Sequence, residues 1–111
     1  MLASEKFEPR ISEHFGKMFG FLNPGDDPAY LIIKTHLMAE EMLYAYIVKQ
    51  ARYPKVLERA RLSFKQLLVL CQALHHIEPA DWWGWTALEK LNSIRNVFAH
   101  NLDSLAAKKK I

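Results

Sequence analysis

The sequence predicts an all-α fold, an up-and-down bundle of four long helices followed by a short C-terminal helix or tail. Apolar residues recur at intervals of three and four along most of the chain, without the strict alternation that is typical of strands. Turn-forming residues gather at a few points only, which separate long periodic segments. The chain has 111 residues, of which 50% are hydrophobic, enough for one core. We therefore expect residues 1–111 to form a single domain.

The first two helices are expected from about Ser4 to Phe21 and from about Pro28 to Arg52. The stretch Asn23–Pro28 supplies the turn between them, and within it Asp27 followed by Pro28 is typical of a helix cap and first helical residue. The second helix carries residues spaced by four and three, which form the seam of a helix packed in a bundle. These residues are Ile33, Leu37, Glu40, Tyr44 and Ile47.

Two further helices are expected in the second half of the chain. Pro54 opens a third element, whose apolar positions run from Val56 to about Ile77, and Glu78 and Pro79 close it. The fourth helix is expected to begin after a cap at Asp81, to enter through Trp82–Trp85 and to end near Asp103. A short basic tail, Ala106–Lys110, follows it. The tryptophans are expected to plug the end of the bundle rather than to stack on nucleic-acid bases, with the lining of a cleft by Trp82 or Trp83 as the alternative.

Charge and composition limit the classes of function. Fifteen Lys and Arg against twelve Asp and Glu give a net charge of +3, which permits an RNA partner without requiring one. Cys71 is the only cysteine, so we exclude an internal disulfide and a Cys-based zinc site, and we expect this residue to be buried. His75 and His76, taken with His36 or His14, do not complete a metal-ligand set, so no metal or other cofactor is expected. The absence of a long apolar run or a signal peptide predicts a soluble, cytoplasmic protein with no membrane contact.

One segment of the fourth helix combines residues suited to chemistry. Arg95 is followed by Asn96 and, four residues later, by His100. An arginine can bind a phosphate with two donors, and a histidine can transfer a proton near neutral pH, so this pair suits phosphodiester cleavage without a metal. At about 100° per residue, Arg95 leaves the edge of the apolar face, beside a polar stripe that contains Asn92, Asn96 and His100. The alternative interpretation is an ordinary solvated face with a chance histidine.

This motif, on the last long helix of a small helical chain, resembles the HEPN superfamily. Its members carry an arginine, four to six intervening residues and a histidine, often with an asparagine directly after the arginine, as at Asn96. The resemblance implies a metal-independent endoribonuclease that acts as a homodimer, with the motifs of two chains facing each other. His100 would then be the general base or acid, Arg95 would stabilise the charged phosphorane, and Asn96 would orient the imidazole or contact phosphate.

The resemblance also implies a biological context and an alternative. RNA is the implied substrate, the context is a toxin-antitoxin system or phage defence, and an antitoxin protein is a candidate partner. In family members with a nucleotidyltransferase antitoxin, a modified tyrosine follows the histidine by two residues; here that position is Leu102, so this modification is not expected. Other HEPN-like domains are non-catalytic dimerisation or regulatory modules, which is the alternative function for this chain.

Two residues outside the motif are expected to position its side chains. Glu40 places a carboxylate in the apolar seam of the second helix, where burial without a partner is unfavourable. Either it pairs with Arg95 and orients the guanidinium, or the helix is rotated slightly and Glu40 is exposed beside Glu41. Asn92, one turn before Arg95, is the other supporting candidate.

Overall fold

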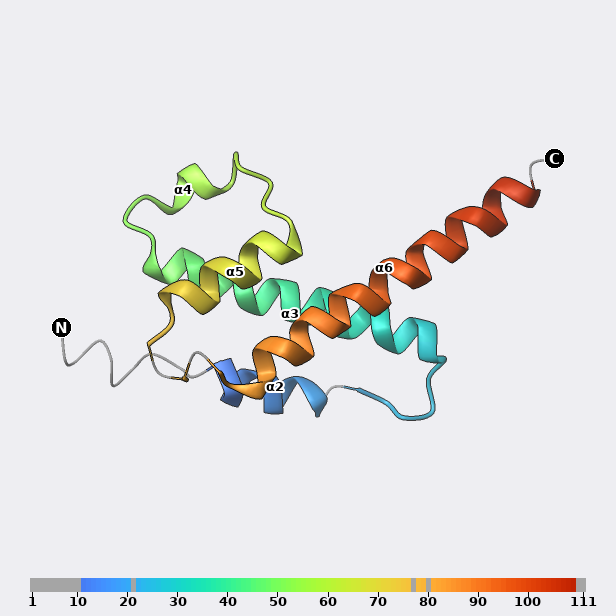
Figure 1. The fold of residues 1–111 in the computed structure, drawn as a ribbon, viewed down its shortest axis with the longest axis horizontal. Coiled ribbons are helices and arrows are strands. Elements are labelled where there is room, and N and C mark those ends of the chain that lie inside the picture. The colour runs from blue at the N-terminus through green and yellow to red at the C-terminus, as the bar shows by residue number, and fades with distance from the viewer. Residues whose placement is uncertain (1–10, 21, 77, 80, 110–111) are drawn as a thin grey trace.

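All described secondary structure of the chain is helical. The computed structural model describes residues 11–20, 22–76, 78–79 and 81–109, and these contain no strand. The helices are α2 (Ile11–Phe19), α3 (Pro28–Gln50), α4 (Pro54–Leu57), α5 (Phe64–Leu74) and α6 (Trp83–Lys109), as shown in Figure 1. The all-α prediction is confirmed. Only α3, with 23 residues, and α6, with 27, are long, so four long helices are not seen in the described part of the chain. The beginning of the first predicted helix, residues 4–10, and Phe21 lie outside the described residues.

Helix α3 begins where the sequence predicts. The carboxylate of Asp27 accepts a hydrogen bond from the backbone N–H of Ala29 at 2.8 Å, and Pro28 occupies the first helical position, where its missing N–H has no partner to lose. The helix ends at Gln50, two residues before the predicted end at Arg52. Local capping chemistry therefore fixes this boundary.

The prediction of one continuous third helix is wrong in its first half, because the helix is interrupted between Leu57 and Phe64. Arg61 has a φ of 46°, in the left-handed region, which a continuing right-handed helix cannot contain. Ser63 then caps a new helix: its Oγ accepts from the N–H of Gln66 at 3.2 Å, and Oε1 of Gln66 accepts from the N–H of Ser63 at 2.9 Å. Helix α5 ends at Leu74, also earlier than predicted.

Helix α6 differs from the prediction at both ends. It begins at Trp83, so Trp82 rather than Asp81 directly precedes the first helical residue. It continues unbroken to Lys109, so the segment predicted as a separate tail from Ala106 belongs to α6 up to that residue. Near its start, a Cβ added to Gly84 would lie 2.2 Å from the ring of Trp82, and this close approach explains the glycine.

The tryptophans plug the bundle only in part. Trp85 is 3% exposed, and its indole N–H donates to the carbonyl of Pro79 at 3.2 Å, as expected for a buried indole. Trp82 is half-buried against it, with ring centroids 5.2 Å apart. Trp83, in contrast, is 63% exposed. The plug prediction therefore holds for Trp85 and Trp82 but is wrong for Trp83.

The core lies around α3, which contacts α2, α4, α5 and α6. Leu43, Leu67 and Leu88, from three different helices, are at most 2% exposed. Cys71 is fully buried, as predicted, and its thiol donates to the carbonyl of Leu43 at 3.4 Å. Burial raises the pKa of this thiol to about 12, because an apolar environment disfavours the thiolate.

The C-terminal part of α6 extends beyond the other helices. Figure 1 shows α6 crossing α3 and continuing past it into open space. Two apolar residues near the crossing remain open to solvent, Ile94 at 45% and Val97 at 59% exposed. Among the described residues, no helix combines the length and the apolar character that a bilayer span requires.

Candidate functional site

The three motif residues are exposed on the same stretch of α6. A nitrogen of the Arg95 guanidinium, Nη1, donates to Oδ1 of Asn96 at 3.3 Å, so these two side chains are adjacent. On a helix, Arg95 and His100 are rotated by about 140° and separated by about 7.5 Å along the axis, with Asn96 between them. The structure therefore places Arg95 beside Asn96, whereas Arg95 and His100 point in different directions around α6.

Asn92 holds this stretch of α6 onto α3. Its side-chain oxygen lies 3.0 Å from Nε2 of His36, a residue that is 4% exposed. An amide oxygen only accepts, so Nε2 of His36 carries the hydrogen of this bond. The His36 ring also stacks on Phe64, with centroids 4.3 Å apart and planes inclined by 27°. His36 thus joins α3, α5 and α6 one turn before the motif.

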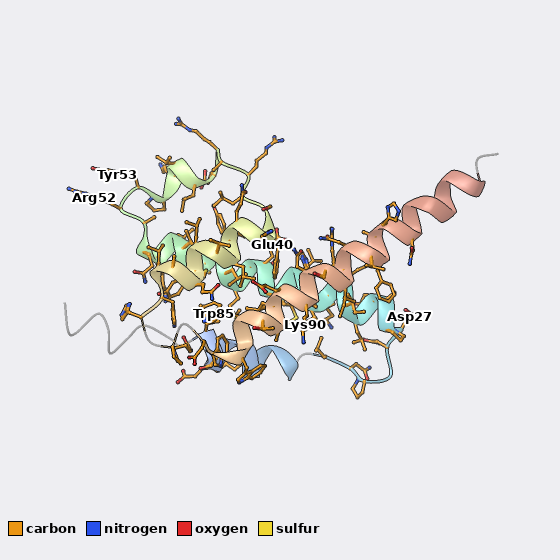
Figure 2. The ribbon with its side chains drawn as sticks, viewed as in Figure 1. Asp27, Glu40, Arg52, Tyr53, Trp85 and Lys90 are labelled. Carbon is orange, nitrogen blue, oxygen red and sulfur yellow. The ribbon has the colours of Figure 1, made fainter. Side chains whose placement is uncertain are left out.

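Glu40 lies beside His36 and does not pair with Arg95. Its carboxylate is 3.9 Å from Nδ1 of His36, which is too far for a hydrogen bond. Both Glu40 and Arg95 are described, and the structure contains no ion pair between them. The side chain of Glu40 is 45% exposed. It is therefore neither buried in a pair with Arg95 nor fully exposed beside Glu41. In Figure 2 it lies beside the beginning of α5, whereas Lys90 projects from the other side of α6.

Sequence reasoning missed the role of His36, which was considered only as a metal ligand. The spacing of His36 and Glu40 by four residues was a readable signal, because residues i and i+4 are neighbours on a helix. The partner of His36 on α6 could not be predicted from the sequence, because Asn92 is 56 residues away. Asn92 and Glu40 both lie against His36, so the predicted pairing of Glu40 with Arg95 is wrong.

A second polar cluster, also missed, is buried at the other end of the bundle. The carboxylate of Glu78 pairs with Nε2 of His75, and its Oε1 accepts from the backbone N–H of Ser12 at 2.8 Å. His75 is 9% and Glu78 7% exposed, and the His75 ring meets Tyr46 at 4.7 Å and Trp85 at 5.9 Å between centroids. The cluster therefore ties α2 to α3, to the end of α5 and to the start of α6.

The charge of Glu78 is stabilised despite its burial. Burial raises the pKa of this carboxyl, but the hydrogen bonds from Ser12 and the field of His75 outweigh that effect and hold the pKa below its ordinary value. The sequence indicated only a helix end at Glu78 and Pro79. The cluster has no nucleophile in line with the histidine, because Ser12 donates to Glu78 and not to His75. We therefore regard it as structural.

The described residues contain no group of three or more His, Cys, Asp or Glu side chains placed to hold a metal ion. His75, which the sequence analysis considered as a metal ligand and rejected, pairs with Glu78.

Comparison with known proteins adds no relative. No family model matches the chain, and no curated protein or solved structure matches it either.

Proposed function

We propose that this chain is a metal-independent endoribonuclease of the HEPN type that acts as a homodimer. One observation carries the proposal: Arg95, Asn96 and His100 are all exposed on one stretch of α6. A phosphate can reach them there without rearrangement of the core. The residues behind them, His36 and Asn92, fix the base of this segment to α3.

The need for a second copy follows from the divergence of Arg95 and His100. A single chain offers either side chain to a phosphate but not both from one side. Val97 lies about 60° from His100 around the helix, and Ile94 about 60° further on. These two exposed apolar side chains form a small patch beside the histidine. Two copies that meet through the side of α6 around Asn96, with Val97 at its edge, bring two imidazoles and two guanidinium groups to one interface.

In such a dimer, His100 of one chain takes the proton from a ribose 2′-hydroxyl, whose oxygen attacks the adjacent phosphorus. His100 of the other chain protonates the departing 5′-oxygen, so the products are a 2′,3′-cyclic phosphate and a 5′-hydroxyl. Arg95 stabilises the extra negative charge of the phosphorane, and Asn96 orients the imidazole or donates to a phosphate oxygen. DNA lacks the 2′-hydroxyl and is not cleaved.

The test is cleavage of single-stranded RNA in the presence of a chelator. Arg95→Ala and His100→Ala are each expected to lower the rate by about 100-fold or more, since proton transfer and charge stabilisation are each of that size. Lys55→Ala is the matched control, because it removes an exposed cation from α4, outside the helix that carries the motif. Sedimentation must show that all variants keep the association state of the parent chain. Equal activity in all variants identifies a contaminating nuclease and refutes the proposal.

The alternative is a non-catalytic dimerisation or regulatory module, which the exposed Ile94 and Val97 also favour. A wild-type dimer that cleaves no RNA would select it. For the nuclease, we propose a toxin-antitoxin or phage-defence role in the cytoplasm, with an antitoxin protein as a partner. Expression of the wild-type chain is then expected to slow growth of the host, whereas a chain with both Arg95→Ala and His100→Ala is expected not to.

A further inference from the structure

A groove of about 350 Å³ opens between α3, α5 and the segment that contains α4. Leu67, which is 2% exposed, lies at its floor. Tyr44, Leu57 and Leu62 are half-buried and line it. At the edge of the groove, Leu37 is 55% exposed. The lining is therefore largely apolar.

The charged residues of the groove are mostly acidic. Glu40 and Glu41 come from α3, Glu58 directly follows α4, and Arg61 is the one cation among the lining residues. Three carboxylates and one guanidinium give a local charge of −2, although the whole chain carries +3. A surface of this sign repels the phosphates of a nucleic acid and attracts basic side chains.

We propose that this groove binds a basic amphipathic segment of a partner protein. An aliphatic side chain of the segment enters between Tyr44 and Leu62, above Leu67, and lysine or arginine residues beside it meet the carboxylates of Glu40 and Glu58. The volume is near the lower end of the range of about 300–1,000 Å³ for ligand sites, which is room for anchoring side chains rather than for a whole helix. This site is separate from the motif on α6 and does not depend on the proposed nuclease activity.

The proposal can be tested with two synthetic fluorescent peptides of about twelve residues. The first has two leucines one helical turn apart with lysines beside them, and the second has glutamate in place of every lysine. In fluorescence anisotropy with the full chain at low salt, the lysine peptide is expected to bind at least about tenfold more tightly than the glutamate peptide. Equal affinity of the two peptides, or no binding of the lysine peptide at millimolar concentration, overturns the proposal.

Substitutions locate the binding. Glu40→Gln and Glu58→Gln are each expected to lower the affinity for the lysine peptide about 2- to 5-fold, which corresponds to the energy of one exposed ion pair. Leu37→Ala is expected to lower the affinity for both peptides, because it removes apolar surface at the mouth of the groove. Leu74→Ala and Glu89→Gln are the matched controls: Leu74 is 50% exposed and Glu89 is exposed, and neither lines the groove.

Two outcomes of these measurements would assign the surface differently. Unchanged affinity in the Glu40, Glu58 and Leu37 variants shows that the peptide binds elsewhere and overturns the proposal. If sedimentation shows that Glu58→Gln dissociates a dimer of the chain, the groove belongs to a second copy and the partner segment proposed here is wrong. Circular dichroism of each variant, which is expected to match the parent, excludes unfolding as the cause.

Discussion

Substitution of Glu78 by Gln tests the energetic weight of the buried cluster. The glutamine keeps the shape of the side chain and an acceptor for the N–H of Ser12, but it removes the negative charge that faces His75. A hydrogen bond to a charged group contributes about 1.5–3 kcal/mol, roughly twice a neutral one. The side chain of Glu78 is only 3% exposed, so solvent replaces little of this interaction. We expect Glu78→Gln to lower the free energy of unfolding by about 2–3 kcal/mol at neutral pH.

The expected penalty depends on pH in a defined direction. The pKa of Glu78 is lower in the folded chain than in the unfolded chain, where it is about 4.3. Its ionised form therefore stabilises the fold fully above that value, and the contribution is lost as the pH falls through the folded pKa. The difference between the parent chain and Glu78→Gln should consequently begin to shrink below about pH 5 and keep shrinking as the pH falls through the folded pKa.

Urea unfolding followed by circular dichroism, repeated across this pH range, measures the penalty directly. Glu89→Gln is the control, because this exposed carboxylate should change stability by less than about 0.5 kcal/mol at every pH. The reasoning is refuted if Glu78→Gln is as stable as the parent at neutral pH, or if its penalty is undiminished at the lowest pH.

Three further predictions follow from other contacts. Asn92→Ala should lower the free energy of unfolding by about 1–2 kcal/mol, since it removes the hydrogen-bond partner of the buried His36. The control Asn96→Ala, at an exposed position, should lower it by less than about 0.5 kcal/mol in the same urea titration. Gly84→Ala should displace the ring of Trp82 and cost about 1–3 kcal/mol; an unchanged thermal midpoint and tryptophan emission would argue against this contact. Cys71 should resist a thiol reagent near pH 8 in the native chain and react promptly in urea, and rapid native labelling would contradict its burial.

Local chemistry made part of the fold predictable. The start of α3 depends on Asp27 and Pro28, which act within one turn, so the sequence contains all the information that the boundary needs. The break before α5 also had a local signal, the Ser63 and Gln66 capping box. This signal was overlooked because the apolar periodicity continues through Val56 and Leu57 and suggested one uninterrupted helix. That period is misleading, because Val56 is 61% exposed and contributes nothing to the core.

The supporting contacts of the site were not predictable, because they depend on where α3 and α6 cross. Arg95, Asn96 and His100 were found from their spacing on a single helix, which sequence periodicity describes well. The contact between His36 and Asn92 requires the crossing point of two helices, which periodicity does not give. For the same reason Glu40 was given Arg95 as one candidate partner, although the residue beside it in space is His36.

The free end of α6 should gain helical order from a partner that packs against it. Short helices without tertiary packing are marginally stable in water, so the turns past the crossing with α3 gain little order from the rest of their own chain. Mass action then couples their helical content to whatever lies against them. If that neighbour is another copy, ellipticity per residue should rise with protein concentration. For the dimeric nuclease proposed above, turnover per molecule should then fall on dilution, before the bundle itself begins to unfold.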